Sequence, residues 1–186
     1  MSFLINPFAF AVAGGDFESI ATVTVGSGGA SSISFTSIPS TYQHLQVRLI
    51  GRTARTGPGD DALGLRFNSD TGNNYALHVL LGNGSSASAS AASSVNLIVG
   101  ANVTSNSATS NTFGCTVVDI LDYANTSKNK TVRALTGFET NTEGKIEVRS
   151  GLWMSTSAIT SLVFASTISS NLLQYSTAAL YGVKAP

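Results

Sequence analysis

The sequence predicts an all-β protein, an antiparallel β-sandwich of jelly-roll type with an extended N-terminal arm. Three observations favour this class. Short segments of alternating apolar and polar residues recur roughly every ten residues, separated by clusters of Gly, Ser, Asn and Asp. None of these segments has a convincing amphipathic helix after it, so the predicted sheets must pack on each other. Hydrophobic residues make up 42% of the 186 residues, which is enough to form one core.

The first fifteen residues, MSFLINPFAFAVAGG, carry no charge. A secretory signal would begin with positive charge, and the Asn6-Pro7 pair disfavours a continuous helix. We interpret residues 1–15 as an extended docking arm and residues 16–186 as a single sandwich domain; the alternative is that the arm is the first core strand of its own subunit. The arm residues expected to bind a partner are Phe3, Leu4, Ile5, Pro7, Phe8 and Phe10.

Residues 19–25 and 33–38 both alternate, and the glycine-rich stretch 26–32 lies between them. This pattern predicts a β-hairpin. A phosphate-binding loop is a poorer interpretation of the glycines, because the lysine and the following helix that such loops need do not occur here.

Residues 38–52 give the clearest strand, with Leu45, Val47 and Leu49 on one face and polar side chains on the other. Residues 63–84 are predicted to form a second hairpin. Its turn, rich in Asn and Asp, lacks the spacing of a calcium-binding loop.

Residues 84–94, GSSASASAASS, have the lowest complexity in the chain and are predicted to be an exposed flexible loop. Residues 111–123 read as a strand with two apolar faces, which indicates a central strand or one buried in a subunit contact. Cys115, in the same segment, is the only cysteine and is expected to be a small buried core residue. Residues 144–154 predict a further strand, with Ile146 and Val148 pointing inward.

The sequence contains no constellation that favours catalysis, a metal or a cofactor. The two histidines, His44 and His78, lie near no nucleophile motif, and no G-x-S-x-G elbow occurs. A glycosidase needs two carboxylates, for which the sequence offers Asp119 with Asp122 or Glu139 with Glu143. All four are better explained as surface charges. We therefore expect a protein that is not an enzyme.

Carbohydrate binding is a weaker alternative, because β-sandwiches often bind sugars on aromatic side chains. The available aromatic residues are Tyr75, Tyr123, Trp153 and Tyr175. The single tryptophan is better explained as a core or interface anchor.

Charge argues against nucleic-acid and membrane partners. Ten basic residues balance ten acidic ones, so no long-range field attracts a polyanion or an anionic membrane. The low charge and the abundance of small polar residues favour self-association, with a homotrimer as the expected state.

Five segments together resemble tailed-bacteriophage virion structural proteins, jelly-roll-like decoration or fibre proteins of marine and freshwater phages. The similarity spans about residues 17–184, and its distinctive stretches are SIATVTVGSGGASSISFTSIPSTYQHLQVRLIGR, LRFNSDTGNNYALHVLLGNG, VVDILDYANTSKNKTVRALTGF, SGLWMSTSAITSLVF and YSTAALYGVK. The resemblance implies a virion component that is assembled in the host cytoplasm.

From these points we expect a capsid decoration, or cement, protein that stabilises the shell. Its partners would be other copies of itself and, through the arm, the major capsid protein or another virion protein. The alternative is a tail-fibre or receptor-binding component that recognises host-surface carbohydrate.

Overall fold

The computed structural model describes residues 15–184, which contain twelve strands and no helix. The strands are β1 (Phe17–Thr24), β2 (Ser32–Phe35), β3 (His44–Gly51), β4 (Asp60–Phe67), β5 (Tyr75–Gly82), β6 (Ala87–Val95), β7 (Ile98–Thr104), β8 (Gly114–Leu121), β9 (Lys130–Glu139), β10 (Gly144–Trp153), β11 (Leu162–Ser166) and β12 (Thr177–Val183). Among these residues, none forms a helix long and apolar enough to cross a membrane.

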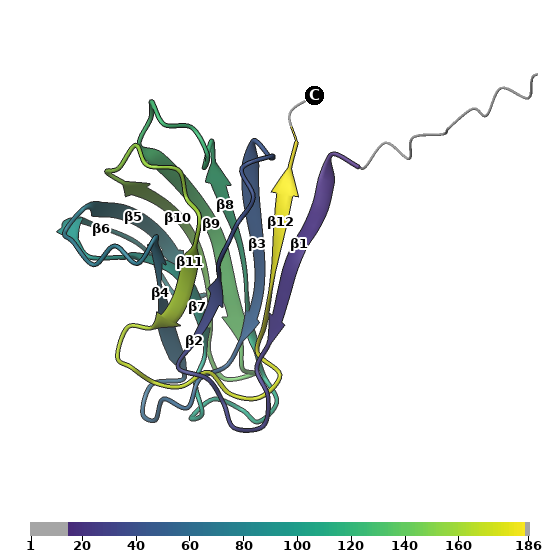
Figure 1. Cartoon of the computed structure of the whole chain (residues 1–186). Coiled ribbons are helices and arrows are strands. Elements are labelled where there is room, and N and C mark those ends of the chain that lie inside the picture. Colours follow the sequence, from purple (N-terminus) through teal and green to yellow (C-terminus); the bar gives the residue numbers. More distant parts are fainter. Residues whose placement is uncertain (1–14, 185–186) are drawn as a thin grey trace, which may run out of the picture.

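The strands form two antiparallel sheets that face each other (Figure 1). The larger sheet has eight strands in the order β1-β12-β3-β8-β9-β10-β5-β6, and the smaller has four in the order β2-β11-β4-β7. The order β1-β12-β3-β8 in one sheet and β2-β11-β4-β7 in the other, with the chain crossing repeatedly between the sheets, is that of a jelly roll. Strand β7 of the smaller sheet packs mainly over β9 and β8 of the larger one. The predicted antiparallel β-sandwich is therefore confirmed, whereas the predicted arm lies almost entirely outside the described residues.

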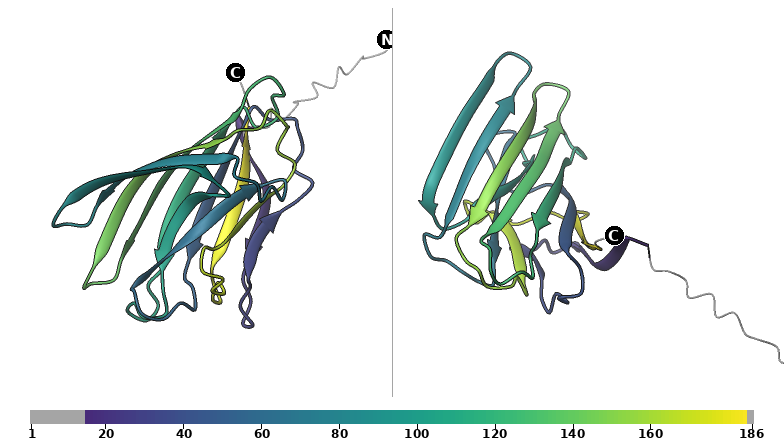
Figure 2. Two further views of the ribbon diagram at one scale, coloured as in Figure 1. Left: turned by 90° about the vertical axis from the view of Figure 1, so that its left-hand side faces the viewer. Right: turned by 90° about the horizontal axis from the view of Figure 1, so that it is seen from above.

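Two hairpins widen the larger sheet beyond this framework. Strand β9 pairs with β10 and strand β5 with β6, and β10 pairs with β5. Figure 2 shows the two hairpins side by side at one margin of the molecule. The eight-stranded sheet therefore extends past the four-stranded one.

The two hairpins predicted from the N-terminal half are wrong. β1 pairs with β12 and β2 with β11, so residues 26–31 connect two sheets instead of closing a hairpin. The turn between β4 and β5 likewise crosses between sheets. A short Gly- or Asn-rich turn between alternating segments is compatible with either connection. Pairing with other strands, such as β12 for β1 and β10 for β5, decides between the two.

The stretch predicted as a flexible loop is also different in the structure. Residues 87–95 form β6, whose side chains are almost all exposed. Its backbone pairs with β5 from Tyr75↔Val95 to Gly82↔Ala87. Main-chain hydrogen bonds therefore hold a segment whose side chains, all small, bury little apolar surface.

The core lies between the two sheets. Leu45, Val47 and Leu49 of β3 are buried there, as predicted. Trp153 is 3% exposed and stacks on Tyr75, with ring centroids 6.3 Å apart. Its indole Nε1–H donates to Asp70 Oδ2 at 2.7 Å, so the tryptophan joins the β4–β5 turn to the core, which confirms its interpretation as an anchor.

Candidate functional site

The most unusual feature of the molecule is the surface of the eight-stranded sheet that points away from the four-stranded sheet, which we call the outer face. Side chains alternate along each strand, so every second residue points to this face. No element among residues 15–184 covers it, and large apolar side chains on it remain exposed: Ile50, Leu80, Val117, Leu121, Leu135, Ile146 and Val148.

The strand register arranges these side chains in rows that run across the sheet. Arg48 lies opposite Val117, Val117 opposite Leu135, and so on to β6. The leucine row runs from β8 to β6 and consists of Val117, Leu135, Val148, Leu80 and Ala89. The neighbouring glycine row starts at β3 and consists of Ile50, Cys115, Gly137, Ile146, Gly82 and Ala87.

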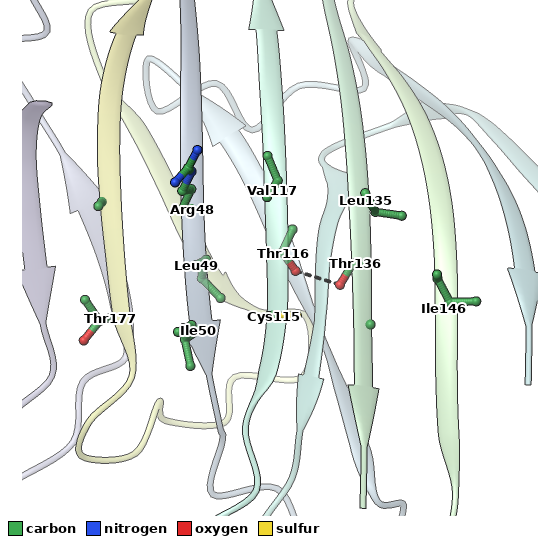
Figure 3. Close-up of a pocket in the computed structure, with 12 residues that line it drawn as sticks. Arg48, Leu49, Ile50, Cys115, Thr116, Val117, Leu135, Thr136, Ile146 and Thr177 are labelled. Carbon is green, nitrogen blue, oxygen red and sulfur yellow. Dashed lines mark hydrogen bonds between the residues drawn. The ribbon is translucent and has the colours of Figure 1, made fainter. Parts of the chain in front are cut away.

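Between these two rows lies a shallow hollow of about 510 Å³. Figure 3 shows Ile50, Val117, Leu135 and Ile146 around it, on the four neighbouring strands β3, β8, β9 and β10. The hollow exists because Gly137 has no side chain, and Cys115, opposite it on β8, has a small one. Arg48 is the only charged residue that lines this depression.

A polar row borders the leucine row on its other side, and its charged groups already have partners. The Gln46 Nε2–H donates to Asp119 Oδ1 at 2.9 Å, and Arg133 Nη2–H donates to Asp119 Oδ2 at 3.0 Å. Arg48, which lies opposite Val117 at the β3 end of the leucine row, donates its Nε–H to the Gln46 Oε1 of the polar row at 3.1 Å. Burying this row would therefore not leave a lone carboxylate without a counter-charge.

Strand β10 reverses the usual pattern of a half-buried strand. Ile146 and Val148, predicted to point inward, lie on the outer face and are 61% and 50% exposed. Glu147 and Arg149 point into the sandwich and are only 2% and 7% exposed. The inward prediction is therefore wrong, and the apolar side of this strand is the side without a covering layer.

Hydrogen bonds within β10 and one from the opposite sheet hold the charged residues of β10 in the core. The Arg149 Nε–H donates to Glu147 Oε2 at 2.8 Å, and the Nη2–H of the same side chain also contacts this oxygen. Asn102 of β7 donates its Nδ2–H to Glu147 Oε1 at 3.2 Å. The carboxylate is thus paired on both oxygens, as a buried charge requires.

Cys115 was expected in the core, and this expectation is wrong. It lies on β8 in the glycine row and is exposed. The cause is the phase of β8: Gly114, Thr116, Val118 and Ile120 point inward, which puts Cys115, Val117 and Leu121 on the outer face. The prediction that both faces of this strand are apolar is confirmed.

The six arm residues predicted to bind a partner lie outside the described residues. They are Phe3, Leu4, Ile5, Pro7, Phe8 and Phe10. Asp122 accepts a hydrogen bond from Lys128 Nζ at 2.7 Å, and this bond is the main reason that the pKa of Asp122 is lowered. No three His, Cys, Asp or Glu side chains among residues 15–184 are grouped so that they could hold a metal ion.

Of the four aromatic residues considered for sugar binding, three are buried. Tyr75 and Tyr123 are fully covered, and Trp153 is nearly so. Tyr175 is 69% exposed, on the β11–β12 loop at the end of the sandwich.

Comparison with known proteins identified no relative: no family model, no curated protein and no solved structure matches the chain.

Proposed function

We propose that this protein is a structural component of a tailed-phage virion that assembles with copies of itself through the outer face. Within that class we propose a capsid decoration protein, attached to the shell by residues 1–15. The observation that carries the assembly is the pair of exposed apolar rows, the leucine row and the glycine row. The virion assignment rests on the resemblance of the sequence to phage structural proteins.

The size of the outer face suits a protein contact. The three rows cover up to six strands at about 4.8 Å per strand and follow one another at about 6.8 Å, which gives roughly 600 Å². Two such faces would bury about 1,200 Å² together, the lower end of the range for specific interfaces. The two apolar rows make up about 400 Å² of one face, the extent of an apolar patch that is often functional.

A second copy of this chain fits the face better than a charged partner. The net charge of the chain is zero, so copies do not repel one another at long range. The charged side chains of the polar row are paired within the face, which leaves apolar contact as the main attraction. The residues with small side chains in the glycine row and on β6 allow another sheet to approach closely.

The oligomeric state of the full chain, measured by light scattering after size exclusion, tests this proposal. We expect a homo-oligomer, with a trimer as the favoured state. Leu135→Asp puts an unpaired carboxylate into the centre of the leucine row and should weaken association by about 100-fold or more. Ser34→Asp, at an exposed position of β2 in the smaller sheet, is the matched control and should assemble normally.

A native chain that stays monomeric would overturn the proposal of self-assembly. A Leu135→Asp variant that assembles as well as Ser34→Asp would show that another surface is used. If deletion of residues 1–15 alone abolishes assembly, the arm joins the copies and the outer face does not.

The proposed attachment to a virion has a separate test. Deletion of residues 1–15 should leave a folded protein that no longer co-sediments with purified phage particles, whereas the native chain does. Immunogold labelling of particles should cover the whole head if the protein decorates the capsid. Label confined to the tail would favour the fibre alternative. The exposed ring of Tyr175, which is available to bind sugar, also favours that alternative.

A further inference from the structure

A second hollow, of about 410 Å³, lies at one end of the sandwich and shares no residue with the leucine and glycine rows of the outer face. Four connections form it: the β1–β2 loop, the β3–β4 loop, the β7–β8 loop and the β11–β12 loop. Figure 1 shows these loops at the lower end of the molecule, whereas β1 begins at the upper end. We call this hollow the end cavity.

Arg52 fixes one wall of the end cavity. Its guanidinium donates to the carbonyl oxygens of Ala108 at 2.9 Å, Thr109 at 2.8 Å and Thr112 at 3.0 Å. These bonds hold the β7–β8 loop. The residue is 7% exposed, and its Nη donors are occupied by carbonyl oxygens of the protein.

The β1–β2 and β11–β12 loops are fastened to each other by their backbones. Leu172 N–H donates to Ala30 O at 2.7 Å, and Ala30 N–H donates to Leu172 O at 3.0 Å. Gly29 has φ +71°, and a Cβ atom there would lie 2.9 Å from Leu172 O. The close approach of the two loops therefore requires a glycine at this position. The end cavity is pre-formed, which lowers the entropic cost of binding a ligand.

Tyr175 contributes an aromatic ring to the end cavity. The residue has φ +72°, a conformation that costs a non-glycine residue about 1 kcal/mol or more. Its side chain is 69% exposed, so packing of the ring does not repay that cost. Three exposed amide side chains line the same cavity: Asn111, Asn171 and Gln174.

We propose that the end cavity binds a neutral saccharide. The ring of Tyr175 offers an apolar face for the C–H face of a pyranose. Amide side chains both donate and accept hydrogen bonds, as sugar hydroxyl groups require. Arg52 is the only charged residue that lines the cavity, and its Nη donors are already bonded to carbonyl oxygens, so they are not free to hold a phosphate or a carboxylate.

The position of the end cavity also suits recognition of a saccharide that lies outside the particle. The described chain begins at the opposite end of the sandwich (Figure 1), so a particle held by residues 1–15 would leave the end cavity pointing away from it. This orientation of the end cavity rests on the proposed attachment through residues 1–15. The binding site itself depends on neither the attachment nor the outer face.

The test is titration of the full chain by isothermal calorimetry and ligand-observed NMR. The probes are glucose, galactose, mannose, N-acetylglucosamine and their β-1,4-linked dimers, with sialic acid and inorganic phosphate as charged probes. We expect at least one neutral sugar to bind, with little or no binding of the charged probes. Tyr175→Phe keeps the ring and should bind within about threefold of the native chain.

Tyr175→Gly removes the ring and also relieves the unfavourable φ, so this variant should fold at least as well as the native chain while losing binding by at least tenfold. Phe17→Ala, at another partly exposed aromatic residue, is the control and should bind normally. The proposal is overturned if no neutral sugar binds at millimolar concentrations, if only the charged probes bind, or if Tyr175→Gly binds as the native chain does. None of these results bears on the assembly of the outer face, which the Leu135→Asp variant tests separately.

Discussion

Removal of the Arg149 charge should strongly destabilise the fold, because Glu147 would stay buried without its counter-charge. Both side chains lie between the sheets, and Arg149 Nε–H donates to Glu147 Oε2 at 2.8 Å. Breaking a buried pair from one side costs about 3–5 kcal/mol. In a domain of this size each kcal/mol moves the melting temperature by about 2–4 °C. Arg149→Met should therefore lower it by roughly 6–20 °C.

The assay is thermal and urea unfolding, both followed by circular dichroism, in the Leu135→Asp background, so that assembly does not add to the stability. The double variant Glu147→Leu/Arg149→Met removes both charges and should recover most of the loss, since apolar replacement of a whole buried pair is often neutral or stabilising. Some loss should remain, because Asn102 Nδ2–H then lacks its acceptor.

The reasoning would be refuted if Arg149→Met lost less than about 1 kcal/mol. It would also be refuted if the double variant were as unstable as the single one. Either result would mean that the inward position of Glu147 and Arg149 does not depend on their pairing.

Two further predictions concern stability. Gly182→Ala should cost about 1–3 kcal/mol in urea unfolding because its methyl group would overlap the ring of Tyr42, whereas Gly26→Ala, which meets no atom within 4 Å, should be nearly neutral. The Trp153 N–H is the main cause of the lowered pKa of Asp70, so Asp70 stabilises the fold above its unfolded pKa, and this contribution is lost as the pH falls through the lower folded value. Thermal unfolding between about pH 6 and pH 2 should show a smaller acid loss for Asp70→Asn than for the native chain.

The sequence was sufficient to predict which residues of a strand share its buried face where the strand has one apolar side and that side faces the core. Strand β3 is such a case: Leu45, Val47 and Leu49 alternate with polar residues and are buried. The composition and the absence of helical periodicity were likewise enough for the fold class, because twelve short strands leave no other way to form a core.

The sequence was insufficient to predict which side of a strand faces the core where contacts with a strand distant in the sequence decide its orientation. On β10, Ile146 and Val148 would normally face the core, but Asn102 of β7 and the pairing of Glu147 with Arg149 stabilise the opposite orientation. Alternation alone cannot reveal such a reversal, since it fixes which residues share a face and not which face is covered. The same limit applies to Cys115, whose neighbours on β8 are apolar on both sides.

The candidate site could be predicted only in part. The two apolar sides of residues 117–121 indicate a central strand or one buried in a subunit contact, and β8 is a central strand of the larger sheet. The leucine and glycine rows could not be foreseen, because they combine residues of six strands whose order in the sheet follows from the jelly-roll connections. The end cavity depends in the same way on four loops that are far apart in the sequence.

The measurement that tests the outer-face assembly most directly is the rate at which a thiol reagent modifies Cys115 in the native protein. This residue is the only cysteine and lies exposed in the glycine row, so its reactivity reports on whether that row is covered. Our account predicts slow modification in the assembled native chain and fast modification in the Leu135→Asp monomer. Equally fast modification in a native oligomer would contradict it, because the outer face would then be open while the copies are joined elsewhere.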